Sequence, residues 1–438
     1  MTARAKLLML DAIGIAFAST QYEFSHRAVA AMCALGGGES DVIGMPTKLG
    51  LRDAVLVNGI LVHGLDYDDT YLPGSVHLTA SCVPTALGVA AFVGSTGRDL
   101  LIACTLGLES GARLGAAGKG GFLKAGFHAT SVVGTFACAL IAGRLMQMSS
   151  SQLVMAQGIA LSTASGNMQP LQDGSWTKRM HPGWAGVAGI TAASLAREGF
   201  IGPTAAYEGR YGLFPCFLGE HARNSDPALV TSGLGEQWEF LRASIKLYPA
   251  GHQSHPFMNA AIKLACEYQL KSEEIESVRA LVTEAAVPLI CEPIAAKRRP
   301  NSAYAAQFSL PYAIACCLVR GRFGLDEIQE SSYSNPVLLE LAQKVDYEID
   351  PKSGFPKFRS GEVIVRTKDG REFARRESIL PDEPVGEYEI VEKFMNNTKF
   401  VMSPFRAEQI RDAVINIERI PNAQRFTRML GSGCASQN

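Results

Sequence analysis

The sequence predicts a mostly α-helical protein in which a smaller α+β domain is inserted into a large all-helical domain. Apolar, alanine-rich segments of helix length fill the first half of the chain. Near residue 246 the pattern changes to include strand-like alternation, and helical periodicity returns after residue 384. The predicted helical domain is therefore residues 1–245 with 385–438, and the predicted α+β domain is residues 246–384.

The helical domain is predicted from eight apolar segments separated by loops rich in Gly, Pro, Asp and Ser. The expected helices are residues 3–19, 25–35, 53–63, 79–96, 99–115, 129–147, 151–165 and 184–199. Asp53 and Asp99 each stand just before an apolar stretch, where a helix N-cap is expected. Gly64 is a stop signal for the third helix. Glu109 and Arg113 are four residues apart and could form a pair of minor stabilising effect.

The α+β domain is predicted from short alternating runs. Residues 277–283 alternate like a strand, and two further strand-like runs flank Asp369-Gly370, which is a hairpin signal. Helical segments are expected at residues 254–269 and 304–320. The last helical region, residues 387–430, is expected to pack back on the first domain.

Composition excludes several classes of partner. The chain has 438 residues, more than one hydrophobic core usually holds, so two domains are expected. Its charges nearly balance, with 41 basic and 42 acidic residues. This balance gives no electrostatic reason to bind nucleic acid or an anionic membrane. No apolar run reaches the length of a membrane span, so we expect neither nucleic acid nor a membrane as partner.

The compartment is predicted from the N-terminus and the cysteines. Residues 1–20 superficially resemble a signal peptide, but Asp11 interrupts the apolar run and the pattern fits a buried helix better. Ten cysteines are scattered without a CxxC pair or any metal-ligand spacing. We therefore expect a cytoplasmic protein with free, mostly buried cysteines and no metal site.

An acidic segment follows the third predicted helix and is the first candidate for a functional site. It places Asp66, Asp68 and Asp69 within four positions, with His77 shortly after. Carboxylates this close cannot all ionise cheaply in a dry site, so one has a raised pKa or a basic partner. The segment is either one wall of an active site or a solvated loop that caps the next helix; the residues alone leave both readings open.

Two further candidates precede apolar helices. His128 stands at a predicted helix N-terminus, where the dipole disfavours a protonated imidazole and backbone amides suit a carboxylate. Lys178 and Arg179, with His181, form a predicted loop between two tryptophans that argue against full exposure. Adjacent cations can clamp a carboxylate. The structural alternatives are a packed or capping histidine and a solvated turn.

The remaining candidates lie in the α+β domain. Lys246 and His255 belong to a segment at the change of pattern, where hinges often form ligand clefts, although an ordinary linker would look the same. Tyr312 begins an apolar run and is more often a core residue in such a position. The combined inventory contains His, Lys, Arg and Asp without a persuasive nucleophile, which suits proton transfer next to a carboxylate.

Five segments together resemble the MmgE/PrpD family, in the same order along the chain. They are residues 63–70 (His-Gly-Leu-Asp-Tyr-Asp-Asp-Thr), 126–131, 173–184, 246–255 and 307–313. The resemblance implies a large all-helical domain with a smaller α+β lid domain, usually in a homodimer, and an activity that needs no metal or other cofactor. The family includes 2-methylcitrate dehydratase, cis-aconitate decarboxylase and iminodisuccinate epimerase.

The resemblance also implies site residues, which we combine with the cations and histidines noted above. The expected catalytic residues are Asp66, His77, His128, Lys178, Lys246 and Tyr312. The expected substrate-binding residues are Thr70, Arg179, His181 and His255. Asp66 is expected to orient or charge a neighbouring histidine or lysine, because three carboxylates would repel an anionic substrate.

The predicted activity is that of a cofactor-independent hydro-lyase acting on a di- or tricarboxylate such as a 2-methylcitrate-like acid. Lys178, Lys246 and Arg179 would hold carboxylates and stabilise the enediolate. His77 or His128 would remove the proton alpha to a carboxylate, and the other histidine or Asp66 would protonate the departing hydroxyl. An epimerase, a decarboxylase and a non-catalytic carboxylate-binding protein remain as alternatives.

Overall fold

The computed structural model describes residues 1–380 and 383–431, and the chain divides into two compact units. One unit is Met1–Ile245 with Val385–Asn438, and the other is Lys246–Pro384. The protein is mostly α-helical, with its four-stranded sheet confined to the second unit. The predicted fold class is therefore confirmed.

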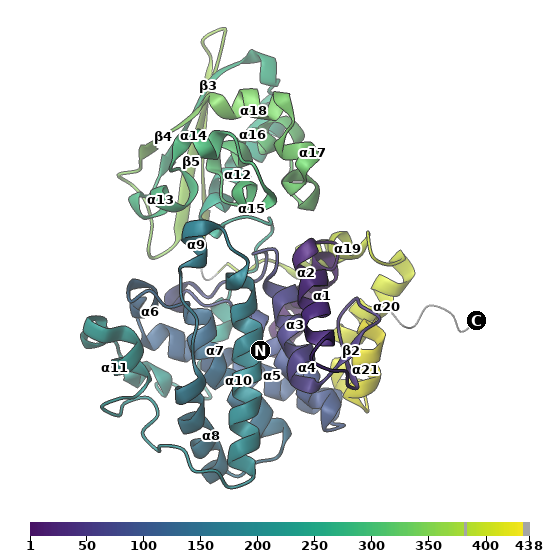
Figure 1. Cartoon of the computed structure of the whole chain (residues 1–438). Coiled ribbons are helices and arrows are strands. Elements are labelled where there is room, and N and C mark those ends of the chain that lie inside the picture. Colours follow the sequence, from purple (N-terminus) through teal and green to yellow (C-terminus); the bar gives the residue numbers. More distant parts are fainter. Residues whose placement is uncertain (381–382, 432–438) are drawn as a thin grey trace. The chain divides into compact units, whose positions relative to one another are not determined.

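The first unit is built around helices that are buried on nearly all sides. Its main helices are α1 (Thr2–Ser19), α3 (Leu51–His63), α4 (Leu78–Phe92), α5 (Gly97–Ala117), α7 (Ala129–Leu145), α8 (Ser150–Thr163) and α10 (Thr177–Arg197). In α4 and α7 almost every side chain is buried, as expected of helices that are apolar all round. Helix α10 packs against α3, α7 and α8, which brings the start of α10 close to the end of α3 (Figure 1).

Two glycines permit the close packing of α3 on α10. A Cβ atom added to Gly59 would lie 2.4 Å from the Cα of Gly183, and one added to Gly183 would lie 2.2 Å from the carbonyl oxygen of Leu56. Larger residues would force the two backbones apart. This contact fixes the distance between the loop that follows α3 and the first turns of α10, which carry the candidate site residues.

The C-terminal helices complete the first unit. They are α19 (Glu387–Thr398), α20 (Pro404–Ile415) and α21 (Ala423–Leu430). Helices α19 and α20 contact α1, and α21 contacts α4, so that the C-terminal helices lie beside helices of the N-terminal region (Figure 1). The prediction that the tail packs back on the N-terminal helices is confirmed.

The second unit is a sheet with the strand order β4-β3-β5-β6, packed against helices. Strand β3 (Ile275–Val282) runs parallel to β4 (Val345–Ile349) and antiparallel to β5 (Arg359–Thr367), which pairs with β6 (Glu372–Ile379). Gly370 has a φ of +86° in the turn between β5 and β6, which confirms the predicted hairpin. Helix α12 (His255–Tyr268) contacts β5, β6 and α16 (Leu310–Arg320).

Some predicted helix boundaries were wrong. The N-cap of α5 is Thr96, whose side chain accepts from the backbone N–H of Asp99, and the N-cap of α3 is Gly50 rather than Asp53. Helix α10 begins at residue 177 instead of 184, so the predicted loop around Lys178 is helical. Pro182 and Gly183 are poor helix formers, and they concealed these two turns from a reading of sequence pattern.

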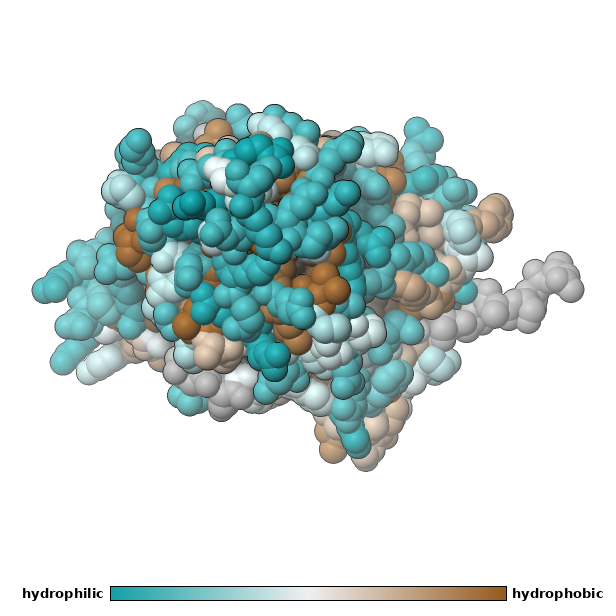
Figure 2. All heavy atoms as spheres, turned by 90° about the horizontal axis from the view of Figure 1, so that it is seen from above, coloured by the Kyte–Doolittle hydropathy of each residue, from teal (hydrophilic) through white to brown (hydrophobic). Residues whose placement is uncertain are grey.

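One helix within residues 1–380 and 383–431 is long and apolar enough to cross a membrane by length and composition. It is α5, and 78% of its apolar window is buried inside the fold, which is the burial of a core helix. Glu109 and Arg113 interrupt the apolar run of α5, and a buried core helix meets the same criteria of length and composition. The face seen in Figure 2 is mainly hydrophilic with scattered apolar patches.

The nine described cysteines are free thiols.

Candidate active site

The acidic segment after α3 is buried, so the interpretation as a solvated loop was wrong. Asp66 is 7% exposed, and Asp68 and Asp69 are completely buried. Asp66 has a φ of +48°, a left-handed conformation that aspartate tolerates better than most residues. Each of the three carboxylates has a different set of partners, and these partners separate their roles.

Asp69 caps the next helix. Its carboxylate accepts hydrogen bonds from the backbone N–H of Leu78 and Thr79 at 3.1 and 2.9 Å, and from the Thr79 hydroxyl at 2.6 Å. Burial raises the pKa of Asp69 to about 6, and the neighbouring Asp68 carboxylate adds to the rise, while the Thr79 hydrogen bonds oppose it. Asp69 is thus committed to holding the start of α4.

Asp68 lies between two histidines. Its Oδ2 atom is 2.8 Å from Nδ1 of His63 and 3.7 Å from Nδ1 of His77. The Nδ1 atom of His77 is also 2.8 Å from the carbonyl oxygen of Asp69. The N–H of each ring thus points toward the acidic segment, and the other ring nitrogen, Nε2, carries the lone pair.

The sequence analysis did not identify His63 as a site residue. It is the last residue of α3 and is 1% exposed. A signal was present, because a histidine that ends a largely apolar helix five residues before an aspartate is an unusual use of a buried position. Burial lowers the pKa of His63, and the Asp68 carboxylate partly opposes this change.

His128 and His181 form a second pair. Their Nδ1 atoms are 3.0 Å apart, so one ring donates while the other accepts. His128 is the N-cap residue of α7, as predicted from the apolar stretch after it, and burial followed by the Lys178 charge lowers its pKa well below the usual value. Burial also lowers the pKa of His181 to about 4. Both imidazoles are therefore uncharged at neutral pH.

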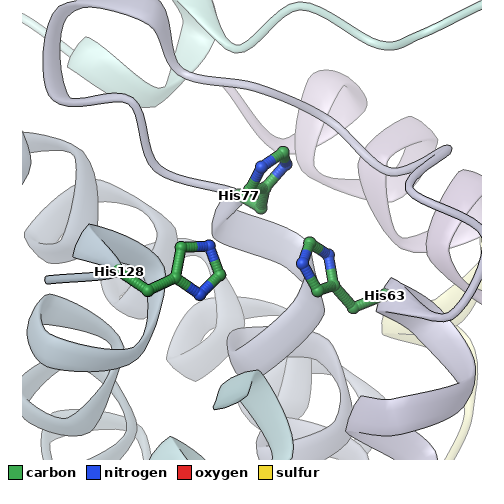
Figure 3. Close-up of side chains that lie close together, drawn as sticks. All are labelled: His63, His77 and His128. Carbon is green, nitrogen blue, oxygen red and sulfur yellow. The ribbon is translucent and has the colours of Figure 1, made fainter. Parts of the chain in front are cut away.

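The four histidines form one cluster, which we call the histidine cluster: His63, His77, His128 and His181. The ring centroid of His63 lies 4.8 Å from that of His77 and 5.6 Å from that of His128. The centroids of His128 and His181 are 5.2 Å apart. In Figure 3 the rings of His63 and His128 face each other, each with a ring nitrogen directed into the space between them.

Lys178 provides the cation beside this cluster. Its Nζ atom lies 3.0 Å from Oδ1 of Asp66, and the two side chains are 11% and 10% exposed. Asp66 thus faces a cation, as the sequence led us to expect. Trp176 and Trp184 are 47% and 41% exposed, while Lys178 and His181 between them are buried, so the segment is only partly exposed, as predicted.

Arg179 holds the first residues of the acidic segment. Its Nε–H donates to the carbonyl oxygen of Gly64 at 2.7 Å, and its guanidinium lies 4.7 Å from the ring centroid of Phe24. Thr70, at the other end of the segment, pairs through its backbone with Ser244. The Thr70 hydroxyl is buried and has no hydrogen-bond partner among the described residues.

A second buried lysine, Lys393, contacts the acidic segment at Tyr67. Lys393 of α19 lies 2.6 Å from the Asp11 carboxylate, with both side chains at most 3% exposed. Its ammonium donates to the Tyr67 carbonyl oxygen at 2.9 Å and lies 3.8 Å from the Tyr67 ring centroid. Sequence pattern could not reveal this contact, because it joins the two ends of the chain.

Three predicted residues belong to the second unit. Lys246 is the first residue of this unit and His255 is the first residue of α12, and both are buried. The ring centroid of His255 lies 4.6 Å from that of His252. Tyr312 is fully buried and its hydroxyl donates to the Glu327 carbonyl oxygen at 2.7 Å. Burial raises the pKa of Tyr312. The catalytic or substrate-binding roles of these three residues stay predictions.

The arrangement in the first unit is suited to moving protons. It offers several neutral imidazoles, a carboxylate that can balance an imidazolium, and an ammonium group for an anionic substrate. One ring nitrogen of each of His63, His77 and His128 lies within 4.8 Å of those of the other two, so these three nitrogens could also bind a metal ion. The Lys178 charge disfavours a further cation at His63 and His128, whereas the Asp68 and Asp66 carboxylates favour one at His63.

Two models of known protein families match this chain. Residues 1–225 match the MmgE/PrpD N-terminal domain, and residues 248–419 match the MmgE/PrpD C-terminal domain.

Curated relatives extend over almost the whole chain. A cis-aconitate decarboxylase-like protein of Aspergillus oryzae is 27% identical over 95% of this chain and 90% of its own length. The cis-aconitate decarboxylase of Aspergillus terreus is 27% identical over 98% of this chain and 91% of its own length. The human cis-aconitate decarboxylase is 27% identical over 98% of this chain and 89% of its own length. The two domain matches cover most of the chain in the order found here, and the chain therefore belongs to the MmgE/PrpD family.

Proposed function

We propose that this protein is a cofactor-independent lyase that removes a proton alpha to a carboxylate of a di- or tricarboxylic acid, in a hydro-lyase reaction. The histidine cluster is the observation that carries this proposal. Burial lowers the pKa of His63, His128 and His181, so these rings are neutral at pH 7 and are acceptors for a proton. Dehydration and epimerisation both need such an acceptor.

The charged groups support an anionic substrate. The Lys178 ammonium can contact a substrate carboxylate and stabilise the enediolate that proton removal creates. Asp66 balances the lysine charge before the substrate binds. Buried polar atoms normally have hydrogen-bond partners, and the Thr70 hydroxyl and the Nε2 atoms of His63 and His128 have none among the described residues. These three atoms are suited to hold a polar ligand.

The roles follow from position. His77 is the more accessible of the candidate bases, with 13% of its side chain exposed, and His128 is the alternative. The proton that one ring removes from the substrate can pass to the other ring, which then protonates the departing hydroxyl. Lys246 and Tyr312 are proposed as further catalytic residues, as the family resemblance implies. Arg179, His181 and His255 are proposed as substrate-binding residues from their sequence motifs.

Decarboxylation is the second candidate, and the curated relatives favour it. Their names assign them cis-aconitate decarboxylation, and losing carbon dioxide produces an enediolate of the same kind. In that reaction the cluster would supply a proton rather than accept one. The neutral state of three of its histidines is the reason that we place proton abstraction first.

The test uses a panel of acids in deuterated buffer, followed by proton NMR. The panel contains 2-methylcitrate, citrate, cis-aconitate and a tartrate-like diacid. Conversion of 2-methylcitrate or citrate to the unsaturated acid supports the hydro-lyase. Loss of carbon dioxide from cis-aconitate assigns the decarboxylase instead, and exchange at a chiral carbon assigns an epimerase. Binding without turnover or exchange of any acid contradicts an enzymatic function and supports a carboxylate-binding protein.

A further inference from the structure

We propose that His63 holds the proton taken from the substrate, with Asp68 as its counter-charge, while His77 or His128 contacts the substrate. This inference rests on the proposed proton abstraction and assigns a role to a residue that the motif comparison did not single out. His63 is a positioning and proton-holding residue, because it is 1% exposed and acts through its neighbours.

The contact with Asp68 carries the first step of the argument. The Nδ1 atom of His63 lies 2.8 Å from Oδ2 of Asp68, and neither side chain is more than 1% exposed. An ionised carboxylate at this distance accepts the Nδ1 proton, fixes that tautomer and makes Nε2 more basic. Protonation of Nε2 then produces an imidazolium that already has its counter-charge in contact.

The other three histidines of the cluster have different contacts at Nδ1. The Nδ1 atom of His77 contacts a backbone carbonyl at 2.8 Å and lies 3.7 Å from Asp68. His128 and His181 contact each other. Asp68 is thus closer to His63 than to His77, and the His63 ring is the one on which the Asp68 carboxylate best stabilises a proton.

The geometry also provides a route for the proton. The Nε2 atom of His63 is buried without a hydrogen-bond partner, and so is the Nε2 atom of His128. These atoms face the same space in Figure 3, and one ring nitrogen of each of His63, His77 and His128 lies within 4.8 Å of those of the other two. One bridging water or substrate hydroxyl spans that distance with two hydrogen bonds.

The proton balance is simple. His77 or His128 takes the proton from the substrate carbon, and the electron pair of the C–H bond remains on the substrate as the enediolate. The new imidazolium passes a proton to Nε2 of His63 and becomes neutral. His63 is then an imidazolium against Asp68, and it returns the proton by the same path to the departing hydroxyl or to the product.

The charged groups around His63 allow this role at neutral pH. Asp68 and Asp66 favour the imidazolium, and Lys178 disfavours it. The ammonium of Lys178 is itself paired with Asp66. His77 and His128 are the remaining titratable neighbours, at ring distances of 4.8 and 5.6 Å. Burial keeps His63 neutral until a proton is supplied.

The decisive variant is His63→Asn. Asparagine can still donate an N–H to Asp68, so it preserves the structural contact, but it cannot take up a proton. We expect kcat to fall about 100-fold, the magnitude of a general acid–base contribution, with KM unchanged and with the acidic limb of the pH–rate profile displaced. Asp68→Asn is expected to give a similar loss. His26→Asn, at an exposed residue of α2 (Glu23–Cys33), is the control and should keep wild-type kinetics.

A measurement without substrate separates this inference from the proposed function. In histidine-labelled wild-type protein, ¹⁵N NMR should find His63 as the Nδ1–H tautomer, and Asp68→Asn should disturb that state. An Nε2–H tautomer in the wild type would overturn the inference, whether or not any acid is turned over. Wild-type kcat and an unchanged pH profile in His63→Asn would also overturn it. Failure of the wild type on the whole panel, with the Nδ1–H tautomer present, would refute the hydro-lyase while retaining the pair.

Discussion

Replacement of Lys178 by methionine should reduce both stability and activity. Methionine keeps an unbranched apolar side chain and removes the ammonium that lies 3.0 Å from Asp66. Removing one partner of a buried ion pair costs about 3–5 kcal/mol of the free energy of unfolding, because the other charge remains buried. Since the two side chains keep 11% and 10% exposure, we expect the lower end of that range, about 3 kcal/mol.

A double variant tests whether the loss comes from the pair. Asp66→Asn combined with Lys178→Met removes both charges, so most of the lost stability should return. The matched control is Lys119→Met, which breaks an ion pair to Asp226 whose side chains are 49% and 39% exposed. Exposed pairs contribute about 0–1 kcal/mol, so the control should stay near the wild type.

Activity gives the second readout of the same variant. If Lys178 stabilises the enediolate, kcat should fall about 100- to 1000-fold, as it does when one donor to a developing oxyanion is removed. Urea unfolding and steady-state turnover on the same preparations are the assays. A stability loss below 1 kcal/mol together with an unchanged kcat would refute our account of Lys178, and a double variant no more stable than the single one would refute the pairing.

Three further predictions test other parts of the structure. The pKa of Asp69 is raised to about 6, so the folded state disfavours the ionised carboxylate. As pH rises from 4 to above 6, ionisation of Asp69 should lower the free energy of unfolding by up to about 3 kcal/mol. Asp69→Asn should flatten that part of the stability–pH profile, measured by urea unfolding. Lys393→Met leaves the Asp11 carboxylate buried without the ammonium that lies 2.6 Å away, so the free energy of unfolding, measured by thermal unfolding, should fall by about 3–5 kcal/mol. Adding Asp11→Asn should recover part of that stability. An equal loss in the double variant would contradict the pairing. Extensive dialysis against EDTA should leave turnover unchanged, whereas loss that returns with a divalent metal would show that the cluster acts through a bound ion.

The sequence was informative where the cause was local. The helix-length apolar segments, the Asp369-Gly370 hairpin and the return of helical periodicity near the C-terminus all correspond to elements of the structure. These features depend on residues next to one another in the chain. The position of His128 at a helix N-terminus was predictable for the same reason.

The sequence was less informative where distant segments meet. The Glu109–Arg113 pair was expected to be minor, but both side chains are buried, and Arg113 also donates to the carbonyl oxygens of Ser232 and Gln237 at 2.7 Å. The Lys393–Asp11 pair and the role of Asp68 between His63 and His77 likewise arise from packing. His63 itself was concealed because a single histidine on an apolar helix resembles a core residue. A cytoplasmic location and a homodimer remain predictions from the sequence.

The most direct test of proton abstraction is a kinetic isotope effect. The acid that is turned over in the panel should be prepared with deuterium at the carbon alpha to the carboxylate, and its kcat/KM compared with that of the unlabelled acid in one competitive experiment. Our account predicts a slower reaction of the deuterated acid, because that C–H bond breaks when the histidine cluster accepts the proton. Equal kcat/KM values for the two acids would contradict it.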